Sequence, residues 1–457
     1  MHTSLLQLGE ELRKRSVSPV ELTQYCLARI EKLNPALNAF ITVTADSALA
    51  EARQAEAEIQ RGDWRGPLHG VPLGLKDLID TAGVRTTAAS ALFKDRIPKQ
   101  DAEVVRRLKQ AGAVFLGKQN LHEFAYGGSS VVSYYGAVHN PWDPACIAGG
   151  SSGGSAAAIA AGLCWGTIGT DTSGSIREPA ALCGVVGLKP TYGRVSADGV
   201  IPLSWSLDHV GPIAATVADA ALILQAVAGH DPADPASADT PVADYVAALN
   251  HHAKPLRIGI PRSYFCEDLH PEIASAFEQA LTVLRGLSAE IRDLELPVPT
   301  DRSLQSAESY AYHRKWIAET PELYQPETLR RIRSGENINH TETLQREQQK
   351  IRQEIGAVFG QVDVLVTPTT PIPSPTVAEL KQHPELLRPR EIVLLRNTRP
   401  ANVWGLPAIS VPCGFTTTGL PIGLQIIGPH WGEATVLKLA HAYEQATAWH
   451  KRPTPLN

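Results

Sequence analysis

Two glycine- and serine-rich segments, separated by one short apolar helix, most constrain how this chain can fold. The first is Gly149-Gly-Ser-Ser-Gly-Gly-Ser155 and the second is Thr170-Asp-Thr-Ser-Gly-Ser-Ile-Arg177. Glycine lets successive backbone N–H groups converge on one point, and such a concavity binds a negatively charged oxygen. Apolar helix and strand patterns flank both segments without a break, which excludes a flexible linker. Fourteen of the 36 glycines lie between Gly127 and Gly193, so we expect a packed core with two functional loops there.

Short apolar runs alternate with helical patterns around these loops. Residues 73–75, 113–116 and 167–168 are typical of buried strands, and residues 101–110 have helical spacing. The helix between the loops, Ser155 to Gly162, is small and apolar on every side, which is typical of a central helix that its neighbours approach closely. Alternating strands and helices predict an α/β fold with helices on both faces of the sheet.

We expect one large domain, residues 1–457, although the length of 457 residues alone suggests about three domains. Residues 1–65 predict a helical arm, in which the capping box Ser18-Pro-Val-Glu21 opens a helix that Asn34-Pro35 should end. Residues 66–230 hold the two loops. Residues 231–457 complete the sheet, with strands at 256–260, 289–294, 362–366, 408–411 and 422–427, helices at 271–287 and 433–445, and a long polar helical stretch at 303–358.

Composition and charge exclude several classes of function. Lys and Arg number 42 against 47 Asp and Glu, so no basic surplus exists for a phosphate backbone and we expect no nucleic-acid partner. No apolar run of about 18 residues predicts a membrane span, and residues 1–15 lack the apolar segment of a secretion signal. The six cysteines form no C-x-x-C pair, which favours reduced thiols in a cytoplasmic protein. The histidines, including His251-His252, lack carboxylates at ligand spacing, so we expect no metal and no cofactor.

The serines of the two loops are candidate nucleophiles, and one interpretation is an α/β-hydrolase-type Ser/His esterase. Gly150-Ser-Ser-Gly-Gly154 matches the nucleophile elbow G-x-S-x-G, which would make Ser152 the nucleophile. That mechanism needs an acid and a histidine in a triad, but Asp208 and His209 are adjacent in the sequence, which suits a triad poorly. It would also leave the second loop unexplained, so it stays an alternative.

A lysine is the other candidate base. Burial lowers the pKa of a lysine because desolvation disfavours the ammonium form, and the neutral amine can then accept a proton. Lys76 and Lys189 each follow an apolar run. A lysine at the end of an apolar strand is more often a surface residue with a buried stem, so spacing alone does not identify a base.

The residues around both loops resemble the amidase signature family. The resemblance rests on three long runs: Gly149-Gly-Ser-Ser-Gly-Gly-Ser-Ala-Ala-Ala158, Gly169-Thr-Asp-Thr-Ser-Gly-Ser-Ile-Arg-Glu-Pro-Ala180 and Cys183-Gly-Val-Val-Gly-Leu-Lys-Pro-Thr-Tyr-Gly-Arg-Val-Ser196. It extends to residues 74–77, 118–124, 206–212 and 423–428, and covers most of 1–230 and again 400–447. It implies the amidase-signature fold, a single large α/β/α sandwich with a mixed central sheet. It also implies an amidase that hydrolyses a carboxylic amide C–N bond through an acyl-serine intermediate.

The family's catalytic triad consists of a serine, a cis-serine and a lysine. Carried over residue by residue, Ser175 is the nucleophile that forms the acyl-enzyme. Ser151, expected after a cis peptide bond from Gly150, relays the proton, and Lys76 is the buried base, neutral at the start of the cycle. A serine hydroxyl is a poor nucleophile until its proton has an acceptor, so a bridging hydroxyl between Ser175 and Lys76 is chemically coherent.

The resemblance also implies supporting residues around the triad. The expected oxyanion hole and substrate contacts are the backbone N–H groups of Thr172, Ser173, Gly174 and Ser175. Further supporting or pocket residues are Ser152, Ala125, Tyr126, Asp171 and Arg177. Arg177 and Glu178 are expected to form an internal ion pair that holds the loop, with substrate binding as the alternative. Family members commonly have Gly-Gly-Ser at the nucleophile, whereas this chain has Ser173-Gly-Ser175, so we expect an ordinary φ at Ser173 and a pocket narrowed by its side chain.

The biological setting stays open between an amidase that acts alone and the glutaminase-type A subunit of a tRNA-dependent amidotransferase. The Phe/Tyr-Asp-Gly-x-Arg-Tyr-Gly segment of that subunit is missing from the middle of the chain, which has Ala311-Tyr-His-Arg-Lys-Trp316. We therefore expect a stand-alone amidase with a small-molecule amide substrate, and a homodimer is compatible with this. Esters and carbamates stay open as substrates. A non-catalytic scaffold is disfavoured because Lys76, Ser151 and Ser175 are intact.

Overall fold

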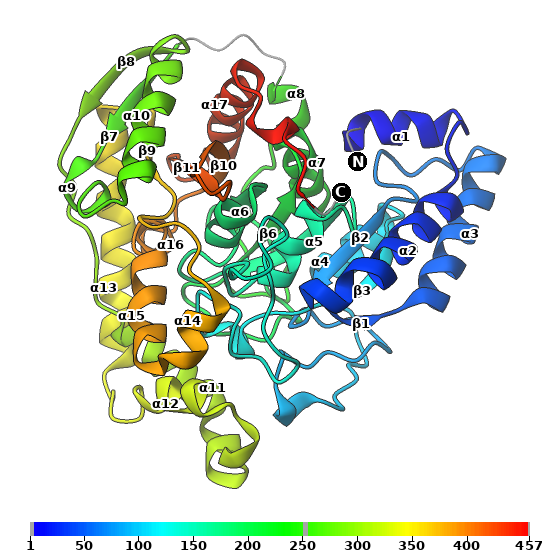
Figure 1. Cartoon of the computed structure of the whole chain (residues 1–457), viewed down its shortest axis with the longest axis horizontal. Helices are drawn as coiled ribbons and strands as arrows, with labels where there is room; N and C mark the ends of the chain where they lie inside the picture. The colour runs from blue at the N-terminus through cyan, green and yellow to red at the C-terminus, as the bar shows by residue number, and fades with distance from the viewer. Residues whose placement is uncertain (1–3, 250–254, 456–457) are drawn as a thin grey trace.

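One mixed β-sheet of eleven strands runs through the described part of the computed structural model, residues 4–249 and 255–455 (Figure 1). The strands are β1 Phe40–Val43, β2 Pro72–Lys76, β3 Val114–Gln119, β4 Gly166–Asp171, β5 Val186–Lys189, β6 His209–Ala214, β7 Leu256–Ile260, β8 Ser288–Asp293, β9 Val364–Pro368, β10 Ala408–Phe415 and β11 Pro421–Ile427. Their order across the sheet is β1-β3-β2-β4-β6-β5-β10-β11-β9-β7-β8. β2 is parallel to β3 and β4, β7 is parallel to β8 and β9, and the other neighbours are antiparallel. The predicted α/β fold with a mixed central sheet is confirmed.

Helices and loops make up the remaining described chain. The α-helices are α1 Leu5–Arg13, α2 Pro19–Leu37, α3 Ala45–Arg61, α4 Glu103–Gln110, α5 Gly153–Ala160, α6 Arg177–Cys183, α7 Val217–Val227, α8 Tyr245–Leu249, α9 Arg262–Phe265, α10 Pro271–Arg285, α11 Ser303–Glu319, α12 Pro326–Arg333, α13 Thr341–Glu354, α14 Val377–Gln382, α15 Pro384–Leu394, α16 Arg399–Val403 and α17 Glu433–Ala446. Short 3-10 turns lie at Ala91–Phe93, Glu123–Ala125, Pro321–Leu323, Ile355–Gly360 and Trp449–Lys451.

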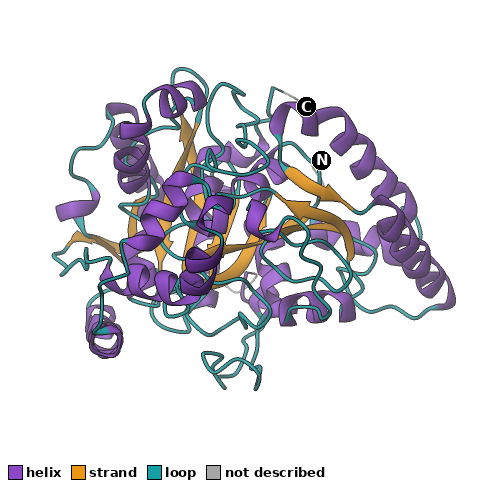
Figure 2. Cartoon of the chain, turned by 90° about the horizontal axis from the view of Figure 1, so that it is seen from below, coloured by secondary structure: helices purple, strands orange, loops and turns teal. Residues whose placement is uncertain are grey.

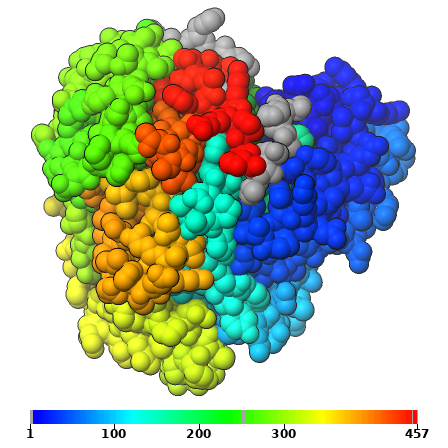
Figure 3. Space-filling model, viewed as in Figure 1, coloured from blue at the N-terminus to red at the C-terminus, as the bar shows by residue number. Residues whose placement is uncertain are grey.

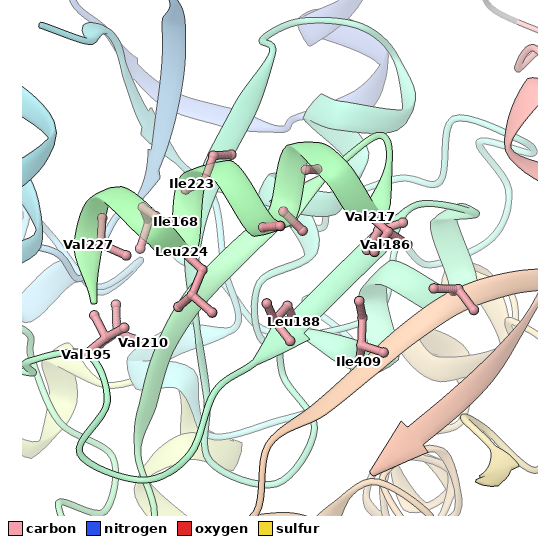
Figure 4. Close-up of a cluster of buried hydrophobic side chains, with 14 of the residues drawn as sticks. Ile168, Val186, Leu188, Val195, Val210, Val217, Ile223, Leu224, Val227 and Ile409 are labelled. Carbon is pink, nitrogen blue, oxygen red and sulfur yellow. The ribbon is translucent and has the colours of Figure 1, made fainter. Parts of the chain in front are cut away.

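These helices cover both faces of the sheet (Figure 2). Alternate residues of a strand point to opposite faces. In β6, Val210 packs in the core that contains α7, whereas Ile213 packs with the alanines of α5 and with α6. Figure 4 shows the α7 side, where Ile223 and Leu224 lie over apolar residues of β4, β5 and β6 such as Leu188. The helix α5 is buried from Gly153 to Ile159, as its composition predicts.

The first helical arm follows its sequence signals except at its end. Ser18 caps α2 by accepting hydrogen bonds from the N–H groups of Val20 and Glu21, as the capping box predicts. Pro35 does not stop the helix, which continues to Leu37. A proline in the last turn costs a single backbone hydrogen bond, and the continued turn brings Leu37 into the core, where it is fully buried.

The long polar stretch at 303–358 is not one helix. Pro321 begins a 3-10 turn and Pro326 begins α12, so the stretch divides into α11, α12 and α13. Proline lacks the N–H that a continuing helix needs, which is why it marks the start of each new segment. The three helices that follow β9, α14 to α16, were not predicted from the sequence.

The N-terminal segment is more than a helical arm. Residues 1–65 also contribute β1, which pairs antiparallel with β3 and forms one edge of the sheet. At the centre of the sheet, β5 from the loop region pairs with β10 from the C-terminal region, with Leu188 opposite Ile409. Segments from both ends of the chain thus share one sheet with the two loops.

Candidate active site

The two glycine–serine loops meet Lys76 at one edge of the sheet. β2 and β4 are parallel neighbours, so their carboxyl ends lie at the same edge, the usual position of sites in α/β proteins. β2 ends at Lys76 and β4 ends at Asp171. The first loop precedes α5, which packs against both strands. The strand order therefore brings three segments together that are far apart in the sequence.

Lys76 is fully buried, and its hydrogen-bond partners are hydroxyl and carbonyl oxygens. Its Nζ lies 2.7 Å from Ser151 Oγ and 2.8 Å from Thr170 Oγ1. Burial lowers the pKa of Lys76 to about 7, while the negative charges of Asp171 and Asp208 act in the opposite direction. An amine with this pKa is largely neutral just above pH 7 and can accept a proton.

Ser151 follows a cis peptide bond from Gly150, the isomer that the resemblance implies. The next residue, Ser152, donates its N–H to the carbonyl oxygen of Ser175 at 3.2 Å, so a hydrogen bond joins the two loops beside both candidate serines. The hydroxyl of Ser152 donates to the carbonyl oxygen of Thr170 at 3.1 Å. Ser152 thus supports the arrangement through backbone contacts and does not contact a histidine within the described residues.

An internal ion pair shapes the second loop. Arg177 and Asp171 are both fully buried, and Arg177 Nη2 lies 2.9 Å from Asp171 Oδ1. Burial alone would raise the pKa of Asp171, but the charge and hydrogen bonds of Arg177 hold it well below its usual range. Asp171 also accepts the N–H groups of Gly174 at 2.7 Å and Ile176 at 3.1 Å. Arg177 therefore holds the loop from inside the protein, but its ion-pair partner is Asp171 and not Glu178, whose carboxylate accepts the N–H of Gly150 at 2.8 Å.

Three backbone N–H groups of the second loop are available to a ligand. In the described chain, the N–H groups of Thr172, Ser173 and Ser175 have no acceptor. That of Gly174 is already used, because it donates to Asp171. Of the four N–H groups expected to form the oxyanion hole, three are therefore without an acceptor in the described chain, and the role of all four stays a prediction.

Ser173 and Gly174 differ in backbone conformation, because only Gly174 has a positive φ. Gly174 has φ 136°, and a Cβ at this position would collide with the hydroxyl of Thr398, so only glycine fits. Ser173 has no positive φ, as predicted. Its hydroxyl donates to Gln305 Oε1 at 3.1 Å, and its carbonyl oxygen accepts from Thr398 Oγ1 at 2.7 Å. The second loop is therefore tied to α11 and to the start of α16.

Ala125 and Tyr126 lie in a short turn against the same helical region. The hydroxyl of Tyr126 is 3.3 Å from Ser306 Oγ, and its carbonyl oxygen accepts a hydrogen bond from Arg331 of α12. Ala125 is buried with φ 58°. Because Ser306 is adjacent to Gln305, this turn and the second loop contact the same end of α11.

Several residues that hold the site were not predicted. Thr170 contacts Lys76, and Asn402 of α16 donates to Asp171 Oδ1 at 2.8 Å. Thr398 and Gln305 bind the backbone and side chain of Ser173. All except Thr170 come from segments more than 100 residues away, and the resemblance assigned none of them a role, although Asn402 lies within its second range, 400–447.

Structural contacts occupy the other candidate groups, namely the acid and histidine of the Ser/His alternative, Asp208 and His209, and the second candidate lysine, Lys189. Asp208 accepts hydrogen bonds from Thr172 Oγ1 and from two backbone N–H groups, and burial raises its pKa to about 7. His209 Nδ1 lies 2.6 Å from the carbonyl oxygen of Leu207. Lys189, which is also fully buried, donates to the carbonyl oxygens of Pro190 and Leu406.

The described residues offer no metal site and no membrane span. Among residues 4–249 and 255–455, no three His, Cys, Asp or Glu side chains are grouped so that they could hold a metal ion. His251 and His252 lie outside the described residues. Over the same residues, no helix combines the length and the apolar character needed to cross a bilayer.

Known proteins resemble this chain over nearly its whole length. A family model, Amidase, matches residues 21–437. Among curated proteins, the A subunit of glutamyl-tRNA(Gln) amidotransferase from Geotalea daltonii is 44% identical over 481 aligned positions, covering 98% of this chain and 98% of that protein. Among solved structures, a chain from a vestigial complex linked to the origins of an s-triazine catabolic enzyme has a TM-score of 0.89 and 33% identity, covering 97% and 98%. Peptide amidase from Stenotrophomonas maltophilia has a TM-score of 0.83 and 34% identity, covering 100% and 99%.

The expectation about partners is wrong. The sequence predicted a small-molecule amide substrate, no nucleic acid and a compatible homodimer. The curated relatives are subunits of an amidotransferase for glutamyl-tRNA(Gln), so they belong to a larger enzyme whose substrate is linked to a nucleic acid. The net charge of −5 concerns only this chain's own surface, and a chain inside an assembly need not bind the phosphate backbone itself.

Proposed function

The chain belongs to the amidase signature family, and we propose that it cleaves an amide C–N bond by transferring the acyl group to Ser175 Oγ. The observation that carries this proposal is the 2.7 Å contact between the fully buried Lys76 Nζ and Ser151 Oγ. A buried amine without a carboxylate partner can act as a base, and the hydroxyl beside it gives the proton a path.

The proposed cycle moves one proton along three groups. Ser175 Oγ attacks the carbonyl carbon while its proton passes to Ser151 Oγ, and the proton of Ser151 passes to Lys76 Nζ. The C–N bond then breaks, and the same path returns a proton to the leaving nitrogen. Water attacks the acyl ester along the same path, which releases the carboxylic acid and restores Ser175. Thr170 Oγ1 accepts a hydrogen bond from Lys76 Nζ and so orients the amine, which lets the nitrogen lone pair face Ser151.

The tetrahedral intermediate needs donors for its negative oxygen. The N–H groups of Thr172, Ser173 and Ser175 have no acceptor among the described residues and can act as these donors. Preorganised backbone donors are often the largest single contribution to catalysis of acyl transfer. In this proposal the ion pair between Asp171 and Arg177 keeps the loop that carries them in one conformation.

We further propose that the reaction takes place within a tRNA-dependent amidotransferase, in which this chain is the amide-hydrolysing component. The support is the 44% identity to the A subunit of a glutamyl-tRNA(Gln) amidotransferase over 98% of both chains. Glutamine would be the amide, and the released ammonia would pass to the charged tRNA on partner subunits. Six unpaired, mostly buried cysteines suit the reducing cytoplasm in which such an enzyme would work.

A fluorophosphonate probe tests the nucleophile. We expect wild-type protein to be labelled on Ser175, and the Ser175→Ala variant to lose labelling and at least about a thousandfold in turnover. Ser155→Ala is the matched control, because this buried serine donates to Gln119 Oε1 at 2.7 Å and not to a group of the proposed triad. It should keep full labelling. Labelling of the Ser175→Ala variant, or turnover by this variant at a tenth of the wild-type rate, would contradict the assignment of Ser175 as the nucleophile.

Co-expression with candidate partner subunits tests the setting. We expect stable copurification, glutamine hydrolysis that rises in the assembly, and amide transfer to glutamyl-tRNA(Gln). Full activity of the isolated chain on peptide amides would favour a second candidate, a peptide amidase. Its supporting observations are the 34% identity to such an enzyme and the sequence of residues 311–316, which stands in place of the A-subunit segment.

A further inference from the structure

Three arginines lie on or beside the helices that contact the second loop, and the one ion pair recorded for them in the described chain is a long one, 3.9 Å between Arg388 and Glu391. Arg302 lies at the start of α11, Arg388 lies on α15, and Arg399 begins α16. In Figure 3 the orange surface from the region of α14 to α16 borders the cyan surface of residues that precede the first loop, while the buried second loop lies beneath the surface. None of the three is used by the proposed chemistry.

Contacts on the second loop place two of these arginines beside it. Gln305, one turn along α11 from Arg302, accepts the hydroxyl proton of Ser173. Thr398, which directly precedes Arg399, donates to the carbonyl oxygen of Ser173 at 2.7 Å. Ser173 is two residues from the proposed nucleophile, so the backbones of both arginines lie close to the loop that would hold the acyl group.

Arg388 approaches the same place from α15. Leu395, which follows α15, is the neighbour that a Cβ on Gly174 would meet at 3.0 Å. Arg388 and Leu395 are seven residues apart and therefore share one face of the helix. Arg388 is thus on the face of α15 that is directed to the loop.

The hydrogen bonds of these arginines leave donors unused. Arg399 is only 3% exposed and bonds to the carbonyl oxygens of Pro299 and Asp301, while its Nε is buried without a partner. The guanidinium of Arg302 makes no hydrogen bond or ion pair with any residue that the structure describes. Arg399 is withdrawn from water with its Nε unpaired, which is costly, whereas Arg302 and Arg388 are partly exposed. An anion bound between them would supply acceptors to all three groups.

The nearest carboxylate is already committed to other groups. Arg388 lies 3.9 Å from Glu391, but Glu391 makes a 2.7 Å ion pair with Arg331 and accepts a 2.6 Å hydrogen bond from Ser129. The group of Arg302, Arg388 and Arg399 therefore keeps a positive excess.

The pKa values of the three groups agree with this picture. Burial, and then the charges of Arg399 and Arg388, lower the pKa of Arg302 to about 9. Burial, with the charge of Arg388, lowers the pKa of Arg399 to about 10, while the charge of Asp301 acts in the opposite direction. All three remain charged at neutral pH, and they repel one another until a negative charge arrives.

We propose that Arg302, Arg388 and Arg399 bind a carboxylate on the acyl part of the substrate, so that the preferred substrates are amides of carboxylate-bearing acyl groups, such as the monoamide of a dicarboxylic acid. This inference rests on the proposed function and names its substrate class. Guanidinium groups match a carboxylate with paired, charge-assisted hydrogen bonds. Glutamine contains such a carboxylate. Its ammonium group would need a free carboxylate, but that of Glu391, beside Arg388, is already paired with Arg331.

Two amides of equal length test the substrate class. Glutaramate ends in a carboxylate where pentanamide ends in a methyl group. We expect the full chain, with its partner subunits if these copurify, to hydrolyse glutaramate with a kcat/KM at least about tenfold above that for pentanamide. Arg302→Met should lower kcat/KM for glutaramate about tenfold more than for pentanamide, mainly through KM. Arg346→Met, at a side chain that is 78% exposed, should change neither.

A binding measurement keeps the inference separate from the chemistry. Calorimetry with glutarate on the Ser175→Ala variant should show binding that Arg302→Met weakens about tenfold. Equal hydrolysis of both amides, equal loss for both in Arg302→Met, or absence of glutarate binding would overturn the inference. If no amide is cleaved and Ser175 is not labelled by a fluorophosphonate, the proposed function fails, while glutarate binding still decides the carboxylate site.

Discussion

The glycine–serine loops and the helical region from α11 to α16 use opposite means to hold a substrate. In the loops, short side chains and backbone groups are fixed by several contacts each, as with Asp171, which accepts bonds from Gly174, Ile176 and Arg177. In the helical region, the charge is carried by long side chains such as Arg302, which makes no hydrogen bond or ion pair with any described residue. Chemistry needs fixed geometry, whereas substrate choice needs only complementary charge at the right distance. The contrast predicts that substitutions in the loops change kcat, and those in the helices change KM.

Two buried lysines make the first test of this contrast. Lys76 and Lys118 are both fully buried with lowered pKa values, about 7 and about 8, chiefly through burial. Lys118 binds the carbonyl oxygen of Ile79 and the hydroxyl of Thr86, the latter at 2.8 Å, away from both serines. Burial alone therefore does not make a base.

The largest effect is expected from Lys76→Met. Loss of the proton acceptor should lower kcat on the order of a thousandfold or more, while the protein stays folded. Lys118→Met should instead lower the melting temperature and leave kcat per folded molecule near wild type. Steady-state kinetics and circular dichroism on both variants test this prediction. A similar loss of kcat in the two variants would mean that the contact between Lys76 and Ser151 is not what distinguishes the proposed base.

The acid limb of the pH profile is the next largest effect. Below its pKa of about 7, Lys76 is protonated and cannot accept a proton, so kcat/KM should fall about tenfold per pH unit and about a hundredfold by pH 5. The charge of Asp208 raises the pKa of this lysine, so Asp208→Asn should move the inflection to lower pH. A rate that is constant from pH 8 to pH 5 would exclude a neutral lysine base.

Gly174→Ala tests how tightly the loop is fixed. A Cβ there needs a left-handed backbone at φ 136° and collides with Thr398, so the neighbouring N–H donors should shift and kcat fall about tenfold or more. Gly83→Ala is the matched control, since Gly83 also has positive φ, 75°, but open space around its Cβ. It should cost stability alone. Equal kcat in the two variants would show that the loop tolerates movement.

The smallest effect is expected from Ser173→Gly, which restores the glycine common in relatives. It removes the hydrogen bond to Gln305 and frees the backbone of the loop. We expect a change within about fivefold in KM and almost none in kcat, because the N–H of residue 173 remains. We also compare KM in Ser173→Gly, Gln305→Ala and the double variant. Because the two groups form one contact, the change in KM of the double variant should equal that of either single variant.

Much of the fold followed from local pattern. The capping box at Ser18 and the all-apolar helix before Gly162 were predicted from residue types and spacing, because caps and helical faces depend on neighbours in the sequence. The end of α2 and the division of the 303–358 stretch were missed. In those places burial of Leu37 and the positions of prolines outweighed periodicity.

The candidate site divides in the same way. The resemblance identified Lys76, Ser151 and Ser175, since long runs around them are local in the sequence. It gave no information on Thr398, Asn402 or Gln305, which reach the loop from distant helices. The sequence by itself determined that two loops of small residues would carry the candidate serines, and its resemblance to a family proposed their roles. The tertiary structure alone decided that Lys76 is buried beside a hydroxyl, that Gly174's N–H is already used, and that three arginines gather near the second loop. The physical reason is that burial and long-range charge depend on the folded neighbours of a residue, which sequence spacing does not encode.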